Sequence, residues 1–338
     1  MTVQFTIIGL GQIGASVGLA LAEHSDRITR IGHDREPNIA KRAREIGAVD
    51  KIFYNLPAAV EKAEIVLLAL PANQIRDTLQ IIAPCLQENA VVMDTSPVKS
   101  AVAEWMKELL PPTCYYVGLT PAINPLYLRE AERGIRAAHP DLFTKGVMAI
   151  SSPQGTVGEA VKLAADLSSL LGAAPYFIDL AEADGMMAAL HIMPQLSAAA
   201  LTNVVMDRAG WKDARRLAGR VYAEATSPVA YGDDEDDALV EAVLQNRENV
   251  VRILNEMISN LEELREDISA QERKKLTKWL ERAHQGRSKW WQERNAGDWQ
   301  STDFEKVKLP KSNLWKRMFG DPGKLFGLPK PNERDEKK

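Results

Sequence analysis

A glycine-rich hexapeptide, Gly-Leu-Gly-Gln-Ile-Gly at residues 9–14, restricts the possible folds more than any other segment. It follows the apolar run Val3 to Ile8 and precedes the helical pattern Ala15 to Glu23. In such a strand–turn–helix unit, the first glycine permits a tight turn and the second lets the backbone approach a pyrophosphate. The third allows close packing of the helix, whose first N–H groups hold the phosphates. The motif predicts a dinucleotide site made by Gly9, Gly11, Gln12, Ile13 and Gly14.

An acidic residue follows where such a site reads the adenine ribose. Asp34 lies 20 residues beyond Gly14, after the second expected strand, Ile28 to His33. Its carboxylate would accept hydrogen bonds from the ribose hydroxyls and repel a 2′-phosphate, which favours NAD over NADP. Arg35 could pair with that phosphate, so NADP stays open.

Apolar runs alternate with helical patterns through the first half of the chain, which predicts an α/β fold with a Rossmann-like, doubly wound parallel sheet. The further expected strands are Ile65 to Leu70, Val91 to Met93, Val147 to Ser151 and Tyr176 to Asp179. The segment Gly118 to Gly134 is expected to be loop or broken helix. After Asp179 the patterns are helical, over Ala183 to Met206 and Leu239 to Glu266. We predict a dinucleotide-binding domain at 1–178, an all-α domain at 179–285 and a basic, aromatic-rich tail at 286–338.

The tail differs from the rest in charge and aromatic content. From Gln285 to Lys338 there are 13 basic and 8 acidic residues, whereas the whole chain has a net charge of −4. Four of the seven Trp residues lie there, and a free disordered tail is normally poor in aromatics. We expect the tail to dock on its own dimer or on another protein, with Leu314 to Phe326 as a candidate membrane-surface or partner-docking segment.

Composition excludes several classes of protein. The acidic net charge gives no reason to expect a nucleic-acid binder. Two cysteines and five histidines without metal-ligand spacing predict neither a disulfide scaffold nor a metal site. No continuous apolar run reaches the roughly 18 residues of a membrane span, and no signal peptide is apparent, so we expect a cytoplasmic protein without a transmembrane segment.

Two further segments follow expected strands and belong to the same edge of the sheet. Leu70 ends the run IVLLAL and Pro71 follows it, while Thr95, Ser96 and Lys99 follow the run VVM. Doubly wound sheets bind ligands at the carboxyl ends of their strands. We expect Leu70, Pro71 and Thr95 near the cofactor and Ser96 near the substrate, while Lys99 could pair with a substrate carboxylate.

From about Val3 to about Arg287, the chain resembles the prephenate/arogenate dehydrogenase family of tyrosine biosynthesis. The resemblance rests on an ordered succession of segments: IIGLGQIGASVGLAL, AEIVLLALPANQI, VVMDTSPVKSAV, YYVGLTPAINP and AEADGMMAALHIMPQLSAAAL. It implies a Rossmann-like domain, a helical domain that forms a homodimer, and an active site between the two. The family reaction passes hydride from a ring carbon to NAD(P), while carbon dioxide leaves and the ring becomes aromatic.

The departures from the family lie at its substrate end. Thr120 occupies the position of the catalytic histidine in the family's Gly-x-His-Pro segment. Ala183 replaces a second histidine, and residues 225–230 lack the substrate-binding arginine. His191 stands one residue before a family histidine, which is a rotation of about 100° on a helix.

The candidate catalytic residues are therefore His191, Thr120, Ser96 and Lys99, with His191 or a water held by Thr120 and Ser96 as the base. Candidates for contacting a carboxylate substrate are Asn124, Gln195 and Arg220. Three interpretations stay open. The chain is a family dehydrogenase with a rearranged pocket, an oxidoreductase for a different small molecule, or a non-catalytic dinucleotide-binding scaffold.

Overall fold

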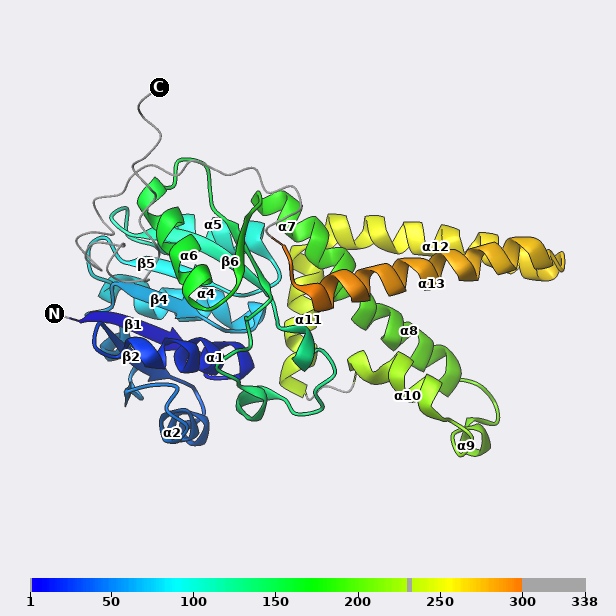
Figure 1. The fold of residues 1–338 in the computed structure, drawn as a ribbon, viewed down its shortest axis with the longest axis horizontal. Helices are drawn as coiled ribbons and strands as arrows, with labels where there is room; N and C mark the ends of the chain where they lie inside the picture. Colours follow the sequence, from blue (N-terminus) through cyan, green and yellow to red (C-terminus); the bar gives the residue numbers. More distant parts are fainter. Residues whose placement is uncertain (1, 230–232, 300–338) are drawn as a thin grey trace, which may run out of the picture.

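The computed structural model describes residues 2–229 and 233–299, which form a sheet covered by helices and an extended helical part (Figure 1). Eight strands make one sheet in the order β3-β2-β1-β4-β5-β6-β7-β8. All neighbouring strands run parallel except β6 and β7. The strands are β1 (Val3–Ile8), β2 (Ile28–His33), β3 (Lys51–Ile52), β4 (Ile65–Leu68), β5 (Val91–Asp94), β6 (Tyr115–Ala122), β7 (Val147–Ser151) and β8 (Ala174–Phe177).

The order of the strands reverses direction between β1 and β4, and ligands bind in the crevice at such a switch point.

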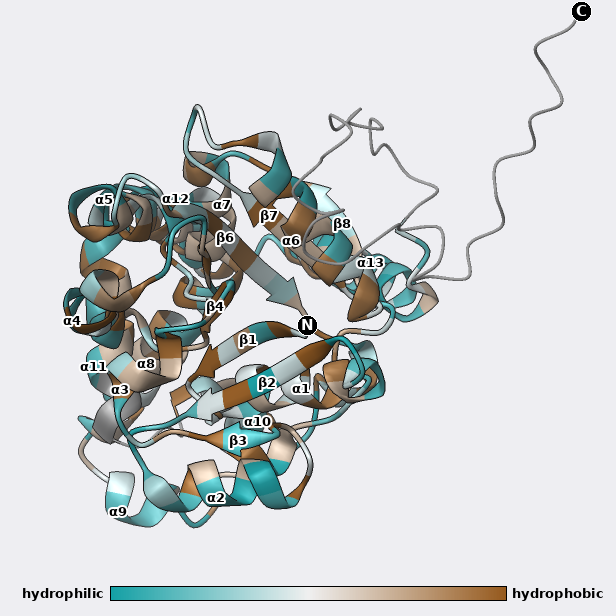
Figure 2. Cartoon of the chain, turned by 90° about the vertical axis from the view of Figure 1, so that its left-hand side faces the viewer, coloured by the Kyte–Doolittle hydropathy of each residue, from teal (hydrophilic) through white to brown (hydrophobic). Residues whose placement is uncertain are grey.

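The helices of the sheet domain are α1 (Gln12–Ala20), α2 (Pro37–Glu45), α3 (Leu56–Val60), α4 (Ala72–Ile82), α5 (Lys99–Leu109) and α6 (Gly158–Leu170). In Figure 2, β1 and β2 lie side by side, and α2 carries both hydrophilic and hydrophobic residues. That mixture follows from its position, because Ala40 and Ala43 are buried while its other side chains are partly or fully exposed.

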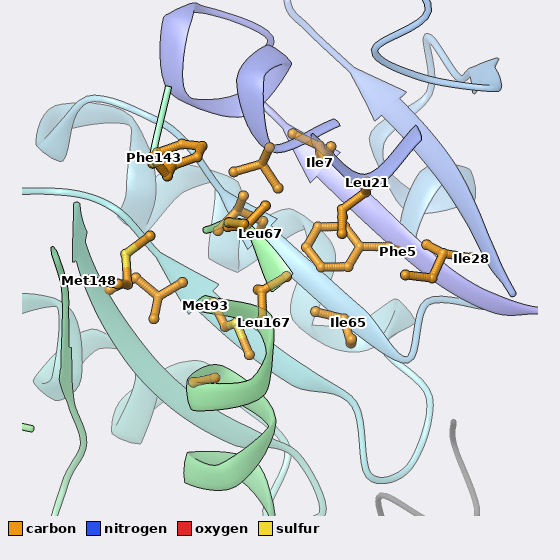
Figure 3. Packing of buried hydrophobic residues seen from close by; sticks show 14 of the residues in the cluster. Phe5, Ile7, Leu21, Ile28, Ile65, Leu67, Met93, Phe143, Met148 and Leu167 are labelled. Carbon is orange, nitrogen blue, oxygen red and sulfur yellow. The ribbon is translucent and has the colours of Figure 1, made fainter. Parts of the chain in front are cut away.

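Alternate residues of the central strands enter two separate cores. Ile7, Leu67 and Met93 pack in one cluster with Leu167 of α6 (Figure 3). Their neighbours Ile8, Val66, Leu68 and Val92 pack in the other, against α4 and α5. Successive side chains of a strand point to opposite faces, so a sheet covered on both faces needs continuous apolar strands. The run at Ile65–Leu68 meets this requirement, since all four residues are buried.

The helical part begins with a continuous helix from Leu180 to Met206. It consists of α7 (Leu180–Met187), a π-helical turn η5 (Ala188–Ile192) and α8 (Met193–Met206). Pro194 lies in the first turn of α8, where proline removes a helical donor and shifts the hydrogen-bond pattern. By length and composition alone, Leu180–Met206 could cross a membrane, and 22% of its most apolar window is buried within this chain.

The remaining helices are α9 (Trp211–Ala214), α10 (Arg220–Thr226), α11 (Asp233–Gln245), α12 (Arg247–Ser269) and α13 (Arg273–Ala296). Figure 1 shows α12 and α13 as a long hairpin that extends away from the sheet, with α13 returning toward it. Helix α13 continues past residue 286, where the tail was expected to begin. The candidate docking segment Leu314 to Phe326 lies outside the described residues.

The predicted fold class is confirmed, while three local expectations differ. The segment from Gly118 onward was expected to be loop, but Gly118–Ala122 completes β6 because it pairs antiparallel with β7. The expected helix Leu239 to Glu266 is divided at Asn246, whose side chain donates to the Asp184 carbonyl at 2.7 Å. The short strand β3 was not expected, and it pairs with β2 over only two residues.

Candidate functional site

A cleft opens at the carboxyl ends of β1, β2 and β4, beside the switch point of the sheet. Six of the expected cofactor-binding residues line it: Gly9, Gly11, Asp34, Arg35, Leu70 and Pro71. The cleft is also lined by Gly134 and Ile135, from the long connection between β6 and β7. Gln12, Ile13 and Gly14 begin α1 directly behind Gly11. The cleft thus joins segments that lie more than a hundred residues apart in the sequence.

The three glycines differ in the space around them. Gly9 has a φ of +90°, and a Cβ there would lie 2.3 Å from the Ala69 carbonyl oxygen. A Cβ at Gly14 would lie 1.9 Å from the Gly9 carbonyl oxygen, so only glycine lets α1 pack this closely. At Gly11 a Cβ would meet nothing within 4 Å. The backbone at Gly11 therefore faces open space at the start of α1, where a helix presents unpaired N–H groups.

Asp34 is oriented by the backbone around it. Its Oδ2 accepts a hydrogen bond from Leu10 N at 2.8 Å, within the glycine motif, and its Oδ1 accepts from Glu36 N at 2.9 Å. Two backbone donors fix the carboxylate at the edge of the cleft. Thr95 is half-buried, and its N–H donates to the Leu68 carbonyl at 3.1 Å, at the end of the neighbouring strand.

A buried polar network lies behind β5. Lys99 is fully buried, and its Nζ lies 2.9 Å from Asp94 Oδ1. Tyr116 donates its hydroxyl to Asp94 Oδ2 at 2.7 Å, and the Ser96 hydroxyl donates to Asp94 Oδ1 at 2.7 Å. Burial lowers the pKa of Lys99, although the Asp94 charge opposes that shift. Burial and the Asp94 carboxylate hold the pKa of Tyr116 well above its usual value, so its phenol keeps its proton.

This geometry corrects the role expected of Lys99. A lysine that binds a substrate carboxylate must present its ammonium to the pocket, whereas Lys99 directs it to the carboxylate and carbonyl of Asp94. Removing that partner would leave a buried charge unpaired. Ser96 is 2% exposed and already donates to Asp94, which corrects its expected role of holding a water. Both side chains position the turn after β5.

A second carboxylate joins the two parts of the chain. Asp184 of α7 accepts hydrogen bonds from the backbone N–H groups of Lys99 and Ser100, at 2.5 and 3.0 Å. It therefore caps the start of α5, where a negative charge is favourable. Asn246 in turn donates to the backbone carbonyl of Asp184. The helical part is thus hydrogen-bonded to the helix that follows the Asp94 turn.

His191 and Thr120 have side chains that solvent can reach. His191 is exposed on the π-helical turn, a feature often found at functional sites. The protein atoms around it lower the pKa of its imidazole by disfavouring the charged form. Thr120 is half-buried near the end of β6, opposite Ala149 of β7.

The three expected substrate contacts have different surroundings. Asn124 is 3% exposed and uses its amide locally, accepting from Leu126 N and donating to the Asp141 carbonyl. This local pairing corrects its expected substrate contact. Gln195 donates from Nε2 to the His191 carbonyl at 2.8 Å. Arg220 is exposed at the start of α10, which Figure 1 shows on the helical part, away from the sheet.

Sequence reasoning missed the partners of this network, namely Tyr116, Asp184 and Asn246. Tyr116 looked like an ordinary strand residue, and Asp184 lies 85 residues from the Lys99 N–H that it accepts from. One signal in the sequence could have found this network. Lys99 begins an expected helix soon after a strand that ends in Asp94. Among the residues that the structure describes, no group of three or more His, Cys, Asp or Glu side chains is placed to hold a metal ion.

Two family profiles match the chain in succession. The profile of the prephenate dehydrogenase nucleotide-binding domain matches residues 17–176, and that of the prephenate dehydrogenase dimerization domain matches residues 179–282. The first match begins just after the glycine motif, so the motif is separate evidence for a nucleotide site. Cyclohexadienyl dehydrogenase of Zymomonas mobilis is 24% identical over 268 residues, which cover 79% of this chain and 88% of that protein. Prephenate dehydrogenase of Bacillus subtilis is 22% identical over 292 residues, covering 82% and 73%.

Solved structures share the fold. The prephenate dehydrogenase of A. aeolicus, in complex with hydroxyphenyl propionate and NAD+, superposes with a TM-score of 0.75 at 18% identity, covering 86% of this chain and 98% of that one. The arogenate dehydrogenase of Synechocystis has a TM-score of 0.67 at 24% identity, covering 85% and 99%. The sheet and the helical part are therefore arranged as in these enzymes.

Proposed function

The chain belongs to the prephenate dehydrogenase family, and from this premise we propose that it oxidises a small cyclohexadienyl carboxylic acid, prephenate or arogenate, with NAD. The observation that carries the proposal is the cleft in which Gly9, Gly11 and Asp34 meet at the switch point of the sheet. NAD would supply the hydride acceptor in this cleft. The non-catalytic scaffold is the weaker interpretation, because the nucleotide-binding and dimerization domains of the family both match, one after the other.

The residues present fit a dinucleotide. The open space at Gly11 and the start of α1 suit a pyrophosphate, and the Asp34 carboxylate suits the two hydroxyls of an adenine ribose. Gln12, Ile13, Leu70, Pro71 and Thr95 belong to the same proposal as neighbours of the cofactor. Asp34 favours NAD, while Arg35 beside it keeps NADP as a second possibility.

We assign the base to His191, which lies exposed on the π-helical turn and whose lowered pKa leaves its imidazole neutral near pH 7. Thr120 would hold the substrate hydroxyl or a water, since threonine has no useful pKa near neutrality. Gln195 and Arg220 remain proposed contacts for the substrate. Asp94, Lys99 and Tyr116 would keep the turn after β5 rigid beneath the site.

A different small molecule is the second candidate substrate. It is favoured by Thr120, which stands where the family carries an imidazole, and by the buried pairing of Lys99, which leaves that cation no role toward a carboxylate. A substrate whose hydroxyl loses its proton more readily would need less help from a base during hydride transfer.

Initial rates of NADH formation with prephenate and, separately, with arogenate test the proposal, with NAD binding measured by calorimetry on the same sample. Turnover with either acid at about 1 per second or faster supports it. NAD binding without turnover on either acid selects the second candidate. Absence of NAD binding contradicts both and favours the scaffold.

We further propose a cytoplasmic homodimer formed through the helical part. Apolar side chains are exposed on η5, α8 and α12, and large exposed apolar patches mark interfaces. They include Leu190, Leu201, Val204, Val251, Ile258 and Leu261. A second copy that covers them would also bury the apolar helix Leu180–Met206, which one chain leaves largely open. Both cysteines are free thiols, as is usual in a reducing compartment.

A further inference from the structure

Helix α13 ends against the sheet domain, beyond the part of the chain that matches the family. The dimerization profile ends at residue 282, whereas α13 continues to Ala296. Its last turn carries Arg294, which is 6% exposed although the rest of the helix is largely solvent-facing. A buried guanidinium is costly unless its donors are used, so the contacts of Arg294 are informative.

Arg294 joins the two ends of one long connection. One of its terminal nitrogens donates to the Ile123 carbonyl, directly after β6, and the other donates to the Lys145 carbonyl at 3.2 Å, shortly before β7. Residues 123–145 run between these two points, and we call them the β6–β7 loop. The planar guanidinium presents donors in a fixed fork, which suits it to bridging two acceptors.

Other side chains strengthen the same contact. Trp299 donates from Nε1 to the Lys145 carbonyl at 3.2 Å, so this oxygen accepts two hydrogen bonds. Lys145 has a φ of +59°, an uncommon value for a non-glycine residue that its surroundings must maintain. The guanidinium of Arg129, in the loop, lies 4.9 Å from the ring centre of Trp291.

The β6–β7 loop also forms one wall of the cofactor cleft. Its 3-10 turn η4 (Gly134–Ala137) packs on α1 and α2, and Gly134 and Ile135 line the cleft together with Asp34 and Arg35. The loop is braced by its own contacts and by one to α1. Tyr127 stacks on His139 and donates to Asp141, while the backbone N–H of His139 donates to the Ser16 hydroxyl of α1. A shift of the loop ends would therefore be carried to the wall.

We propose that Arg294 is a positioning residue for the cofactor. By holding both ends of the β6–β7 loop, it fixes the cleft wall at Gly134 and Ile135, and it ties NAD affinity to the docking of α13. This inference rests on the proposed cofactor, and it gives the last turn of α13 a function that the two family domains do not include.

The test measures NAD binding to the full chain and to the variant Arg294→Lys, which keeps the charge and removes the fork. Arg282→Lys, an exposed position on the same helix, is the matched control. We expect the Kd for NAD to rise about three- to tenfold in Arg294→Lys, as part of a charged hydrogen bond is lost. The control should match the wild type, and the KM for the acid substrate should change less than the KM for NAD.

Hydrogen exchange of the same proteins gives the second readout. Amides of residues 128–138 should exchange faster in Arg294→Lys, while those of β4 and β5 keep their protection. If Arg294→Lys does not fold, Trp299→Phe removes one donor to the Lys145 carbonyl and should shift both readouts in the same direction.

An unchanged Kd for NAD in a folded variant, or unchanged exchange in the loop, overturns the inference while leaving the proposed function intact. Failure of the wild type to bind NAD contradicts the proposed function instead. The two failures are therefore distinguishable in one set of titrations.

Discussion

The carboxylate of Asp184 lies 2.5 Å from the backbone nitrogen of Lys99, so a side chain of the helical part caps a helix of the sheet domain. The same carboxylate accepts from Ser100, and it is 5% exposed. This contact fixes the start of α5 relative to α7. Helix α5 begins directly after the turn that follows β5. It is a direct hydrogen-bonded link between the segments that match the two family domains.

Loss of this cap should destabilise the protein. We expect Asp184→Asn to lower the free energy of unfolding by about 1–2 kcal/mol, because the amide cannot replace a charged acceptor for two N–H groups. Urea denaturation followed by circular dichroism measures the change. Glu182→Gln, an exposed carboxylate on the same helix, is the control and should change stability little. Equal effects of the two substitutions would contradict the capping role.

Lys99 should matter for stability rather than for substrate affinity. Lys99→Met leaves the buried Asp94 carboxylate without its cation, and such changes cost about 3–5 kcal/mol. Adding Asp94→Asn should recover part of that loss, so the two effects are less than additive. Denaturation of the single and double variants measures the coupling. A folded Lys99→Met protein of normal stability with a strongly raised KM for the acid would restore the carboxylate-binding role.

Lys99 was expected to bind a substrate carboxylate and instead pairs with Asp94, and the contrast with correctly located elements has a physical cause. The glycine motif and the strands Val3–Ile8 and Ile28–His33 could be located because their signals are local: turn chemistry and continuous apolar runs. The Lys99 ammonium pairs with Asp94, only five residues earlier. Tyr116 bonds Asp94 and Asp184 accepts from the Lys99 backbone N–H, and both reach these partners only through the fold. Likewise, Gly118–Ala122 contains proline and glycine and becomes strand because Gly118 pairs with β5 and the whole segment pairs with β7.

His191 should control the acid side of the pH profile. A base whose pKa is lowered from the usual 6.5 stays neutral at pH 7 and gains its proton only at a lower pH. We therefore expect kcat/KM to be constant near neutrality and to fall as the pH drops through a pKa below 6.5. His191→Asn should abolish turnover with unchanged affinity for NAD. Turnover that survives this substitution would remove His191 from the mechanism.

Asp34 should determine the choice between the two nicotinamide cofactors. Asp34→Asn removes the charge that repels a 2′-phosphate, and it weakens the contact to the ribose. We expect the Kd for NAD to rise about tenfold and the Kd for NADP to fall, so the preference narrows or reverses. Glu36→Gln, on the same rim of the cleft, is the matched control. If both substitutions shift the two affinities equally, general charge rather than the position of Asp34 sets the preference.

The apolar face of α8 and α12 should hold two chains together. In a single chain, Val204 is 64% exposed and Leu201 is 41% exposed, so both leave apolar surface open to solvent. Introducing a charge into a covered apolar surface is unfavourable. We therefore expect Leu201→Glu combined with Val204→Glu to convert a dimer into monomers in sedimentation experiments at micromolar concentration. Leu126→Glu provides the control, since Leu126 is 76% exposed and belongs to the β6–β7 loop rather than to α8 or α12. A wild-type protein that sediments as a monomer, or a double variant that remains dimeric, would place the interface elsewhere or remove it. A dimer that dissociates only in the double variant would assign these helices to the interface and explain why so apolar a segment is left open by one chain.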